Sequence, residues 1–347
     1  MIQKSNSAPS QSTRSSTPQK EVSRSYVYGL VKRSPDLSIK KARIIEVDRS
    51  LFVTPTTISN FFDKLEGLNE QGKYSPSMIA NFDETMVQCS QTRVAVVGPK
   101  DSKTLNINQV SEMPHITLGV TIFADGSWPS NLLIYPRKSL PQEMSEEYLL
   151  QNHKICFAGQ KSGWIDTAIL ESHLEKVVLP HFLEQRKKSS SSHRGLLLLD
   201  GHASRINDKI WPLFKEHDID VLTFVSHASH VLQPLDLVPF AVFKQLLSKG
   251  LSAMKQVTLP AKCKFVIDKA IDALYHALSP HNIAVGFRKA GIYPIDRSVP
   301  LNHPAINNDP NTPPVPIRRR RTTIRLDGDI LTSDEAIQRM REDKKRT

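Results

Sequence analysis

Three aspartates stand in or directly after strand-like segments, where their side chains could share divalent metal ions. Asp83 lies in "IANFDETM", Asp200 closes the apolar run "GLLLLD", and Asp236 closes the proline-bearing segment "VLQPLD". An ionised carboxylate in such surroundings is costly unless something uses its charge. Carboxylates that converge raise one another's pKa values unless cations lie between them. Their hard oxygen atoms suit Mg²⁺ or Mn²⁺, and two such ions about 4 Å apart support displacement at phosphorus. The three residues therefore predict a two-ion centre for phosphodiester cleavage or transfer.

Each aspartate also has a structural interpretation. Asp200 precedes Gly201 and could form a turn, Asp236 could cap a helix, and Asp83 could pair with a lysine. Strand alternation turns Asp83 and Glu84 to opposite faces, so one of the two must face inward, and periodicity leaves open which one. Taken together, the positions of the three aspartates along the predicted elements favour the shared metal centre.

The elements that would position these residues follow a recognisable order. Strand-like stretches separated by turns come first, and consecutive stretches with short links predict an antiparallel meander; they cover residues 77–87, 92–98, 115–126 and 131–137. A helix kinked at Pro180 follows, then a wholly apolar strand over 195–200, a helix from about Ser204 to His217, and a second buried strand over 219–225. Buried strands joined through helices imply parallel pairing. The order predicts an α/β fold of the ribonuclease H-like type: a mixed sheet, three antiparallel strands followed by parallel strands, flanked by helices.

Helical periodicity places the last aspartate and closes the core. A helix that begins near Leu237 would turn Asp236 toward the sheet, on one stripe with Phe240, Phe243, Leu247, Leu251 and Met254. A second helix presents Ile267, Ile271, Leu274 and Leu278 on one face, and Ser279 and Pro280 start a third that ends near Gly291. Thr332 and Glu335 stand in capping-box relation, which predicts a solvent-exposed terminal helix on a flexible linker.

The positive charge of the chain is concentrated at its ends. Residues 1–50 carry ten Lys/Arg against four Asp/Glu and residues 317–347 carry ten against six, whereas the rest carries 26 against 25. Basic ends beside a neutral core favour a polyanionic partner, most simply nucleic acid. The run Arg318, Arg319, Arg320, Arg321 follows a proline-rich stretch and reads as a nuclear localisation patch.

Cysteine usage and hydropathy exclude several classes. Cys89, Cys156 and Cys263 are odd in number and in no metal-ligand spacing, so neither a disulfide framework nor a structural zinc site is predicted. The first residues lack the apolar core of a signal peptide, and no run approaches the roughly 18 apolar residues of a membrane span. We therefore expect a soluble, intracellular protein that does not engage a membrane.

Five ordered motifs resemble the DDE superfamily endonuclease domain of pogo, Tigger and jerky-like transposases and their relatives, which include centromere protein B. They are "NFDET" from Asn81, "SGW" from Ser162, "LLLLDGHAS" from Leu196, "SHASHVLQPLDLVPFAVFK" from Ser226 and "GFRKAGIYPID" from Gly286. The resemblance covers about residues 23–297. It implies that Asp83, Asp200 and Asp236 form the catalytic triad and hold two Mg²⁺ or Mn²⁺ ions, and it selects Asp83 over Glu84.

The resemblance also suggests accessory residues and marks departures. His202, His227 and His230 lie in matching motifs beside the acids, where we expect them to shape the loop, with metal ligation as the alternative. Met86 stands where the family usually has glycine, and Arg205 where it often has histidine. The segment "SYVYGLVKRSPDLSIKKARI" is similar to the end of the family's helix-turn-helix DNA-binding region, and we expect the DNA-recognition module that it belongs to in the family to be missing or truncated.

These observations define an expected organisation and function. We expect a disordered tail over 1–24, a remnant of the helix-turn-helix region and linker over 25–74, the DDE catalytic domain over 75–297, and a proline-rich, basic tail with a short helix over 298–347. The expected function is metal-dependent DNA cleavage and strand transfer by a transposase-derived, nuclear protein that could form a homodimer. The alternative is a catalytically inactive, domesticated or decayed transposase that binds DNA. A ribonuclease of the RNase H type is disfavoured by the transposase-like motifs.

Overall fold

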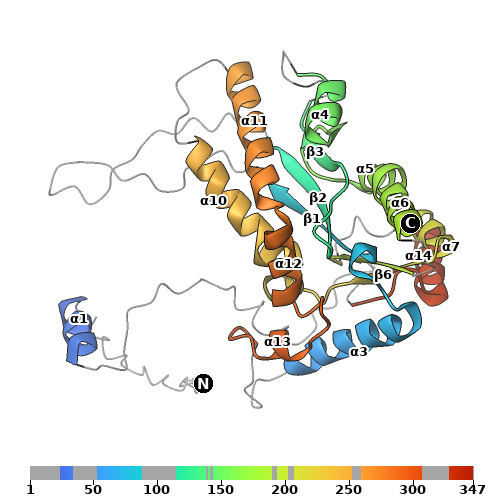
Figure 1. Cartoon of the computed structure of the whole chain (residues 1–347), viewed down its shortest axis with the longest axis horizontal. Helices are drawn as coiled ribbons and strands as arrows, with labels where there is room; N and C mark the ends of the chain where they lie inside the picture. The colour runs from blue at the N-terminus through green and yellow to red at the C-terminus, as the bar shows by residue number, and fades with distance from the viewer. Residues whose placement is uncertain are drawn as a thin grey trace, which may run out of the picture. The chain divides into compact units, whose positions relative to one another are not determined.

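The chain divides into two compact units, residues 1–45 and 46–347. The computed structural model describes residues 24–33, 53–87, 115–137, 140, 144–189, 194–201, 207–251, 259–306 and 328–346. In the first unit it describes one helix, α1 (Arg24–Arg33). All other elements belong to the second unit (Figure 1). His202, Ser204, Arg205, Met254, Cys89, residues 92–98 and the run Arg318–Arg321 lie outside the described residues.

A six-stranded mixed sheet forms the centre of the second unit. Its strands are β1 (Ile79–Met86), β2 (Thr117–Phe123), β3 (Asn131–Tyr135), β4 (Ile155–Gly159), β5 (Gly195–Leu199) and β6 (Ile219–Thr223), in the spatial order β4-β3-β2-β1-β5-β6. The pairs β1–β2 and β2–β3 are antiparallel, whereas β3–β4, β1–β5 and β5–β6 are parallel. The predicted ribonuclease H-like mixed sheet, with its antiparallel meander followed by parallel strands, is confirmed.

Helices cover both faces of this sheet. Alternation in β5 sends Leu196 and Leu198 into one core and Leu197 and Leu199 into the other. The first core is completed by α3 (Pro55–Gly72), α10 (Pro239–Leu251), α11 (Leu259–Ala277) and α12 (Pro280–Lys289); the second by α5 (Thr167–His173), α6 (Leu179–Lys188), α7 (Ile210–Glu216) and α14 (Asp334–Arg346) (Figure 1). Because both of its faces are buried, β5 is apolar throughout.

Several predicted helices are found with the expected signals. Where the sequence predicts a kink at Pro180, a π-helical turn, η2 (Leu174–Val178), joins α5 to α6, and Pro180 lies in the first turn of α6. Ser279 caps α12 by accepting a hydrogen bond from the Asn282 N–H at 3.3 Å, and Gly291 follows with φ +67°. The remaining short elements are η1 (Pro76–Met78), α4 (Glu146–His153), α8 (Ser229–Leu232), α9 (Pro234–Leu237) and α13 (Ser298–Leu301).

Helix α3 packs on the sheet, although we expected residues 25–74 to lie outside the catalytic domain. Phe61 packs on Phe224, which follows β6, with ring centroids 5.7 Å apart. Arg297 donates to Glu66 at 2.9 Å and lies 2.9 Å from Asp63. Buried aromatic residues at helical spacing thus place α3 in the same compact unit as β1, so contacts cross the boundary that we expected at residue 74.

The C-terminal helix is also part of the core, and the prediction that it is solvent-exposed is wrong. Met340 and Ile337 of α14 are buried in the second core, beside Trp211 and Phe214 of α7. The cap is Ser333, whose Oγ accepts from the Ala336 N–H, and not Thr332. Thr332 instead accepts a hydrogen bond from the Val221 N–H at 3.2 Å. The apolar stripe of the helix therefore has a partner on the far face of the sheet, which the capping signal alone does not indicate.

Candidate metal centre

Four carboxylates are carried to one edge of the sheet by three elements. Asp83 and Glu84 lie in β1, and Asp200 directly follows β5, the parallel neighbour of β1. The carboxyl ends of parallel neighbours meet at the same edge, which is where ligands gather in open α/β sheets. Asp236 lies in α9, which contacts β1. The three aspartates predicted from the sequence therefore converge on β1.

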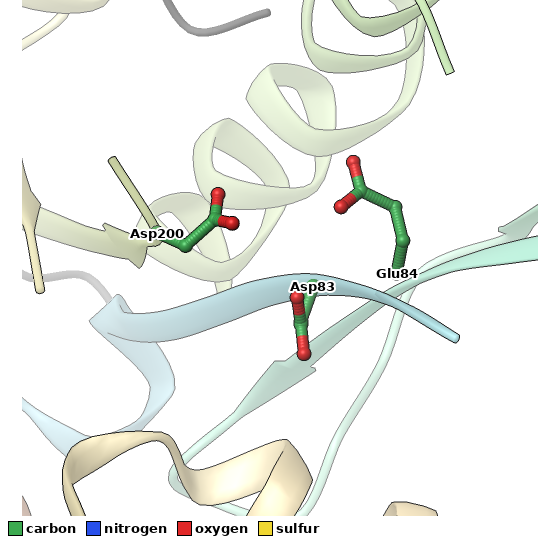
Figure 2. Close-up of side chains that lie close together, drawn as sticks. All are labelled: Asp83, Glu84 and Asp200. Carbon is green, nitrogen blue, oxygen red and sulfur yellow. The ribbon is translucent and has the colours of Figure 1, made fainter. Parts of the chain in front are cut away.

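Asp83, Glu84 and Asp200 form a compact acidic cluster. Each offers one carboxylate oxygen, and these oxygens all lie within 4.8 Å of one another. Figure 2 shows the Asp83 side chain on one side of the β1 ribbon and the Glu84 side chain on the other, with Asp200 reaching in from the end of β5 on the Glu84 side. Glu84 was not selected from the sequence, because alternation turns Asp83 and Glu84 to opposite faces and only one of them was expected to face inward.

Asp83 stands in the centre of the negative charge. Its side chain is only 8% exposed. Burial raises the pKa of Asp83 well above 3.8, and the negative charges of Asp236, Glu84 and Asp200 raise it further, against a smaller opposing effect of a backbone hydrogen bond at Glu84. Asp236 makes the largest of the charge contributions, so it belongs to the same electrostatic centre although it lies outside the compact acidic cluster.

The residues present fit a divalent cation. Their ligand atoms are carboxylate oxygens, the type that Mg²⁺ and Mn²⁺ prefer. Carboxylates this close cannot all ionise in a buried setting unless positive charge is supplied. A cation bound among them would offset the repulsion that raises the pKa of Asp83. The donor set and the electrostatics of the centre therefore agree on a divalent metal.

Asn81 connects the three elements that carry the aspartates. Its side chain is fully buried, and its Nδ2 donates to the Leu198 carbonyl of β5 at 3.1 Å. Its Oδ1 accepts from the Leu235 N–H of α9 at 3.1 Å. Asn81 stands two residues before Asp83, Leu198 two before Asp200, and Leu235 one before Asp236. One buried amide thus fixes the relative positions of all three aspartates.

The α9 turn that holds Asp236 is fixed on two sides. The Gln233 carbonyl accepts from the Asp236 N–H at 3.1 Å, which closes the turn. On the other side, a Cβ on Gly286 of α12 would lie 2.6 Å from the Pro234 carbonyl oxygen. Only glycine allows α12 to approach this closely. Gly286 opens the "GFRKAGIYPID" motif, so part of that motif supports the segment with the third aspartate.

The described accessory histidines lie between β6 and α9. His227 is exposed and has a left-handed backbone conformation, with φ +64°. His230 is in α8, with its ring centroid 6.3 Å from that of His303. The unusual φ of His227 agrees with a role in shaping the loop, and that role, like metal ligation by either histidine, stays a prediction.

Comparison with known proteins identifies the domain. Residues 115–287 match the family model described as DDE superfamily endonuclease. This chain contains a DDE superfamily endonuclease domain. The match includes Asp200 and Asp236, while β1 with Asp83 and Glu84 precedes it.

Solved structures support the fold of this DDE domain. A pre-cleavage Mos1 transpososome is similar with a TM-score of 0.52 and 13% identity, over 81% of this chain and 70% of the other. The Mos1 mariner paired end complex with Mn is similar with a TM-score of 0.50 and 12% identity, over the same shares of the two chains. At such identity the likeness shows a shared fold.

One sequence relative matches this chain over only a part of the relative's own length. The chain is 27% identical over 242 residues to a protein of Cochliobolus lunatus named MFS-type transporter clz9. This match spans 68% of this chain but only 25%, about a quarter, of that relative. Among the described residues, no helix is both long and apolar enough to cross a membrane.

Proposed function

We propose that this DDE domain is a transposase-derived nuclease that cleaves DNA phosphodiester bonds and transfers DNA strands. The observation that carries the proposal is the convergence of Asp83, Glu84 and Asp200 at the carboxyl edge of the sheet, with Asp236 adding to the same buried negative potential. The similar structures are a Mos1 mariner paired end complex with Mn and a pre-cleavage Mos1 transpososome. DNA is therefore the partner that we propose for this chain.

Asp83, Asp200 and Asp236 are the proposed metal ligands, and Glu84 is an additional candidate. Divalent ions held there, two Mg²⁺ or Mn²⁺ in our proposal, would lower the pKa of a water molecule or a DNA 3′-hydroxyl and neutralise charge on the phosphate. Asp83 is the proposed ligand that both ions share, because the charges of both Asp200 and Asp236 raise its pKa. The carboxylates must be deprotonated to act as ligands, and Asn81 keeps the elements that carry them in register.

The subfamily and the cellular location are also part of the proposal. The motifs from "NFDET" to "GFRKAGIYPID" favour the pogo and Tigger branch of the DDE superfamily. The run of four arginines from Arg318 and the basic ends of the chain favour a nuclear, DNA-bound protein.

DNA nicking tests the proposal. We expect the purified full chain to nick supercoiled DNA with Mg²⁺ or Mn²⁺ and to be silent in EDTA. Asp200→Asn should lose at least about 100-fold in rate, since it removes a charge that metal-assisted displacement requires. Asp125→Asn is the matched control, because Asp125 is exposed in the turn between β2 and β3, at the opposite edge of the sheet.

Two outcomes would contradict the nuclease proposal in different ways. Equal nicking by the wild type and Asp200→Asn would show that the activity does not arise at this centre. Tight DNA binding with no nicking and no Mn²⁺ binding, the latter measured by electron paramagnetic resonance, would favour the alternative of an inactive DNA-binding protein.

A further inference from the structure

An exposed aromatic pair lies at the end of the sheet that carries the candidate metal centre. Trp164, in the loop between β4 and α5, is 59% exposed, the highest value among the exposed large hydrophobic side chains of the described residues. Its ring stacks on that of His115, with centroids 4.0 Å apart and an interplanar angle of 29°. An indole that keeps most of its surface in water does little for a core, so its exposure calls for another explanation.

The Trp164–His115 pair is held rigidly by a hydrogen-bond network. The Thr117 hydroxyl donates to the Gly163 carbonyl at 2.8 Å and lies 3.1 Å from His115 Nε2. Since the hydroxyl proton is used at Gly163, His115 Nε2 carries the hydrogen and donates to Thr117. Gly163 has φ +73°, and a Cβ there would lie 2.3 Å from the His115 carbonyl oxygen. Only glycine allows this approach, so the "SGW" motif builds a preformed surface.

The pair is uncharged at neutral pH. Burial lowers the pKa of His115 below its ordinary value of 6.5. The ring beneath the indole is therefore a neutral imidazole whose tautomer is set by Thr117. A neutral, flat and preformed surface favours stacking with another flat ring over an ionic contact.

The strand register places this surface next to the acidic cluster. Thr117 is the partner of Met86, which is two residues beyond Glu84 in β1. Two strand residues span about 7 Å. Thr117 and Gly119, the partner of Glu84, share one face of β2, so Thr117 and Glu84 lie on the same face of the sheet. The indole thus lies at the same end of the strands as Glu84 and on the same face of the sheet.

We propose that Trp164, supported by His115, stacks an unpaired base of the DNA strand that the metal centre cleaves; this inference rests on the proposed function. Under that function the backbone of the strand passes the acidic cluster, and neighbouring bases come within reach of the indole. Lys161, which is exposed three residues before Trp164, supplies a positive charge for a phosphate. Bases inside a duplex already stack on each other, so the site takes a base that is frayed, overhanging or displaced.

Binding to two DNA probes tests the stacking site in the full chain. The first probe is a duplex that ends in a single-stranded overhang of thymines, and the second is the same duplex with blunt ends; both are measured by fluorescence anisotropy in EDTA. Stacking of a base on an aromatic residue is worth about 1–3 kcal/mol, so Trp164→Ala should weaken binding of the overhang probe about 5- to 150-fold. Binding of the blunt probe should change by less than about twofold, and Trp164→Phe should retain most of the preference.

Tyr275→Ala is the matched control. Tyr275 of α11 is 41% exposed and packs edge-on against Trp128, with ring centroids 5.2 Å apart. Trp128 lies in the turn between β2 and β3, at the opposite end of the strands from the acidic cluster. This variant also removes an exposed aromatic ring, and it should bind both probes as the wild type does. A 2-aminopurine in the overhang provides a direct readout, since its fluorescence should be quenched by the wild type and not by Trp164→Ala.

The outcomes separate this inference from the nuclease proposal. Equal binding of the overhang probe by Trp164→Ala and the wild type would overturn the stacking site, as would an equal loss of affinity for both probes. Loss of the overhang preference and of the 2-aminopurine quenching would support it, even in a protein that fails to nick DNA. If Trp164→Ala does not fold, Trp164→Phe and the 2-aminopurine signal of the wild type still decide between these outcomes.

Discussion

At the scale of single residues, Asp83 couples the metal centre to protein stability. Its pKa is raised by burial and by three neighbouring carboxylates. The folded protein therefore holds this proton more tightly than the unfolded chain does. Without metal, the unfolded state releases the proton first as the pH rises above 3.8, so the contribution of Asp83 to stability falls as the pH rises toward its folded-state pKa. Above that pKa, the ionised group is a net cost to the fold.

Asp83→Asn should consequently stabilise the metal-free protein at neutral pH. We expect its melting temperature in EDTA at pH 7 to exceed that of the wild type, with a difference that shrinks toward pH 4, because the variant cannot ionise. The same variant should lose Mn²⁺ binding. Asp125 is exposed, so Asp125→Asn should leave both the melting temperature and Mn²⁺ binding unchanged. A lower melting temperature for Asp83→Asn at every pH would contradict the electrostatic account.

His173 is the reason to compare variants with the wild type at each pH. It is buried in α5, and burial lowers its pKa to about 4. Its contribution to stability is present above the ordinary histidine value of 6.5 and is lost as the pH falls toward 4, the direction opposite to that of Asp83. The wild-type profile contains both effects, and the difference between the wild type and Asp83→Asn isolates one.

At the scale of elements, patterning identified most of the fold. The strands with Asp83 and Asp200 were predictable because alternation and wholly apolar runs are strong signals for half-buried and fully buried strands. Strand β4 was missed, since "ICFAG" is short, only partly buried and without alternation. The helix expected from near Leu237 is α10, which begins at Pro239, and Asp236 belongs to a separate short helix, α9, because Pro239 lacks the N–H that would continue that helix. Glu84 was missed because only one face of β1 was expected to face inward. Helices cover both faces of the sheet, so Asp83 and Glu84 can both belong to the candidate metal centre.

Asn81 gives the prediction at this scale, since it joins β1, β5 and α9. Asn81→Ala should lower the free energy of unfolding by about 1–3 kcal/mol, because it leaves buried backbone groups without their partner. It should also weaken Mn²⁺ binding by about 10- to 100-fold, as expected when a group that orients ligands is removed. Urea unfolding and electron paramagnetic resonance titration measure the two effects.

Asn131→Ala is the matched control for Asn81→Ala. Asn131 is also fully buried, and its Oδ1 accepts from the Thr121 N–H at 3.2 Å, but it lies in β3, which β2 separates from β1 and its carboxylates. It should lose comparable stability and keep its Mn²⁺ affinity. Equal loss of affinity in both variants would mean that Asn81 acts only through general stability.

At the scale of the whole molecule, the C-terminal segment completes the sheet-bearing unit. Residues 329–332 run along β6: the Thr223 N–H donates to the Asp329 carbonyl at 2.9 Å, and the Leu331 N–H donates to the Val221 carbonyl at 2.8 Å. An isolated antiparallel bridge joins Leu222 to Ile330. Because β6 ends the sheet, this segment covers an edge that would otherwise present unpaired backbone groups. The segment after residue 297, which we expected to be a tail, thus contributes to the core.

A chain that ends at residue 327 should therefore be unstable. It loses the cover of the β6 edge and three buried apolar side chains, Leu331, Ile337 and Met340, each worth about 1.5–3 kcal/mol. We expect the melting temperature to fall by roughly 10 °C or more and the protein to aggregate with rising concentration, because the exposed edge can pair with another copy. A chain that ends at Met340 removes only the last turns of α14 and keeps these contacts, so it should melt close to the wild type. Calorimetry measures the melting temperatures of the two truncated chains, and light scattering measures their aggregation. Equal melting temperatures would show that the cover of the β6 edge and the apolar stripe of α14 contribute little to stability.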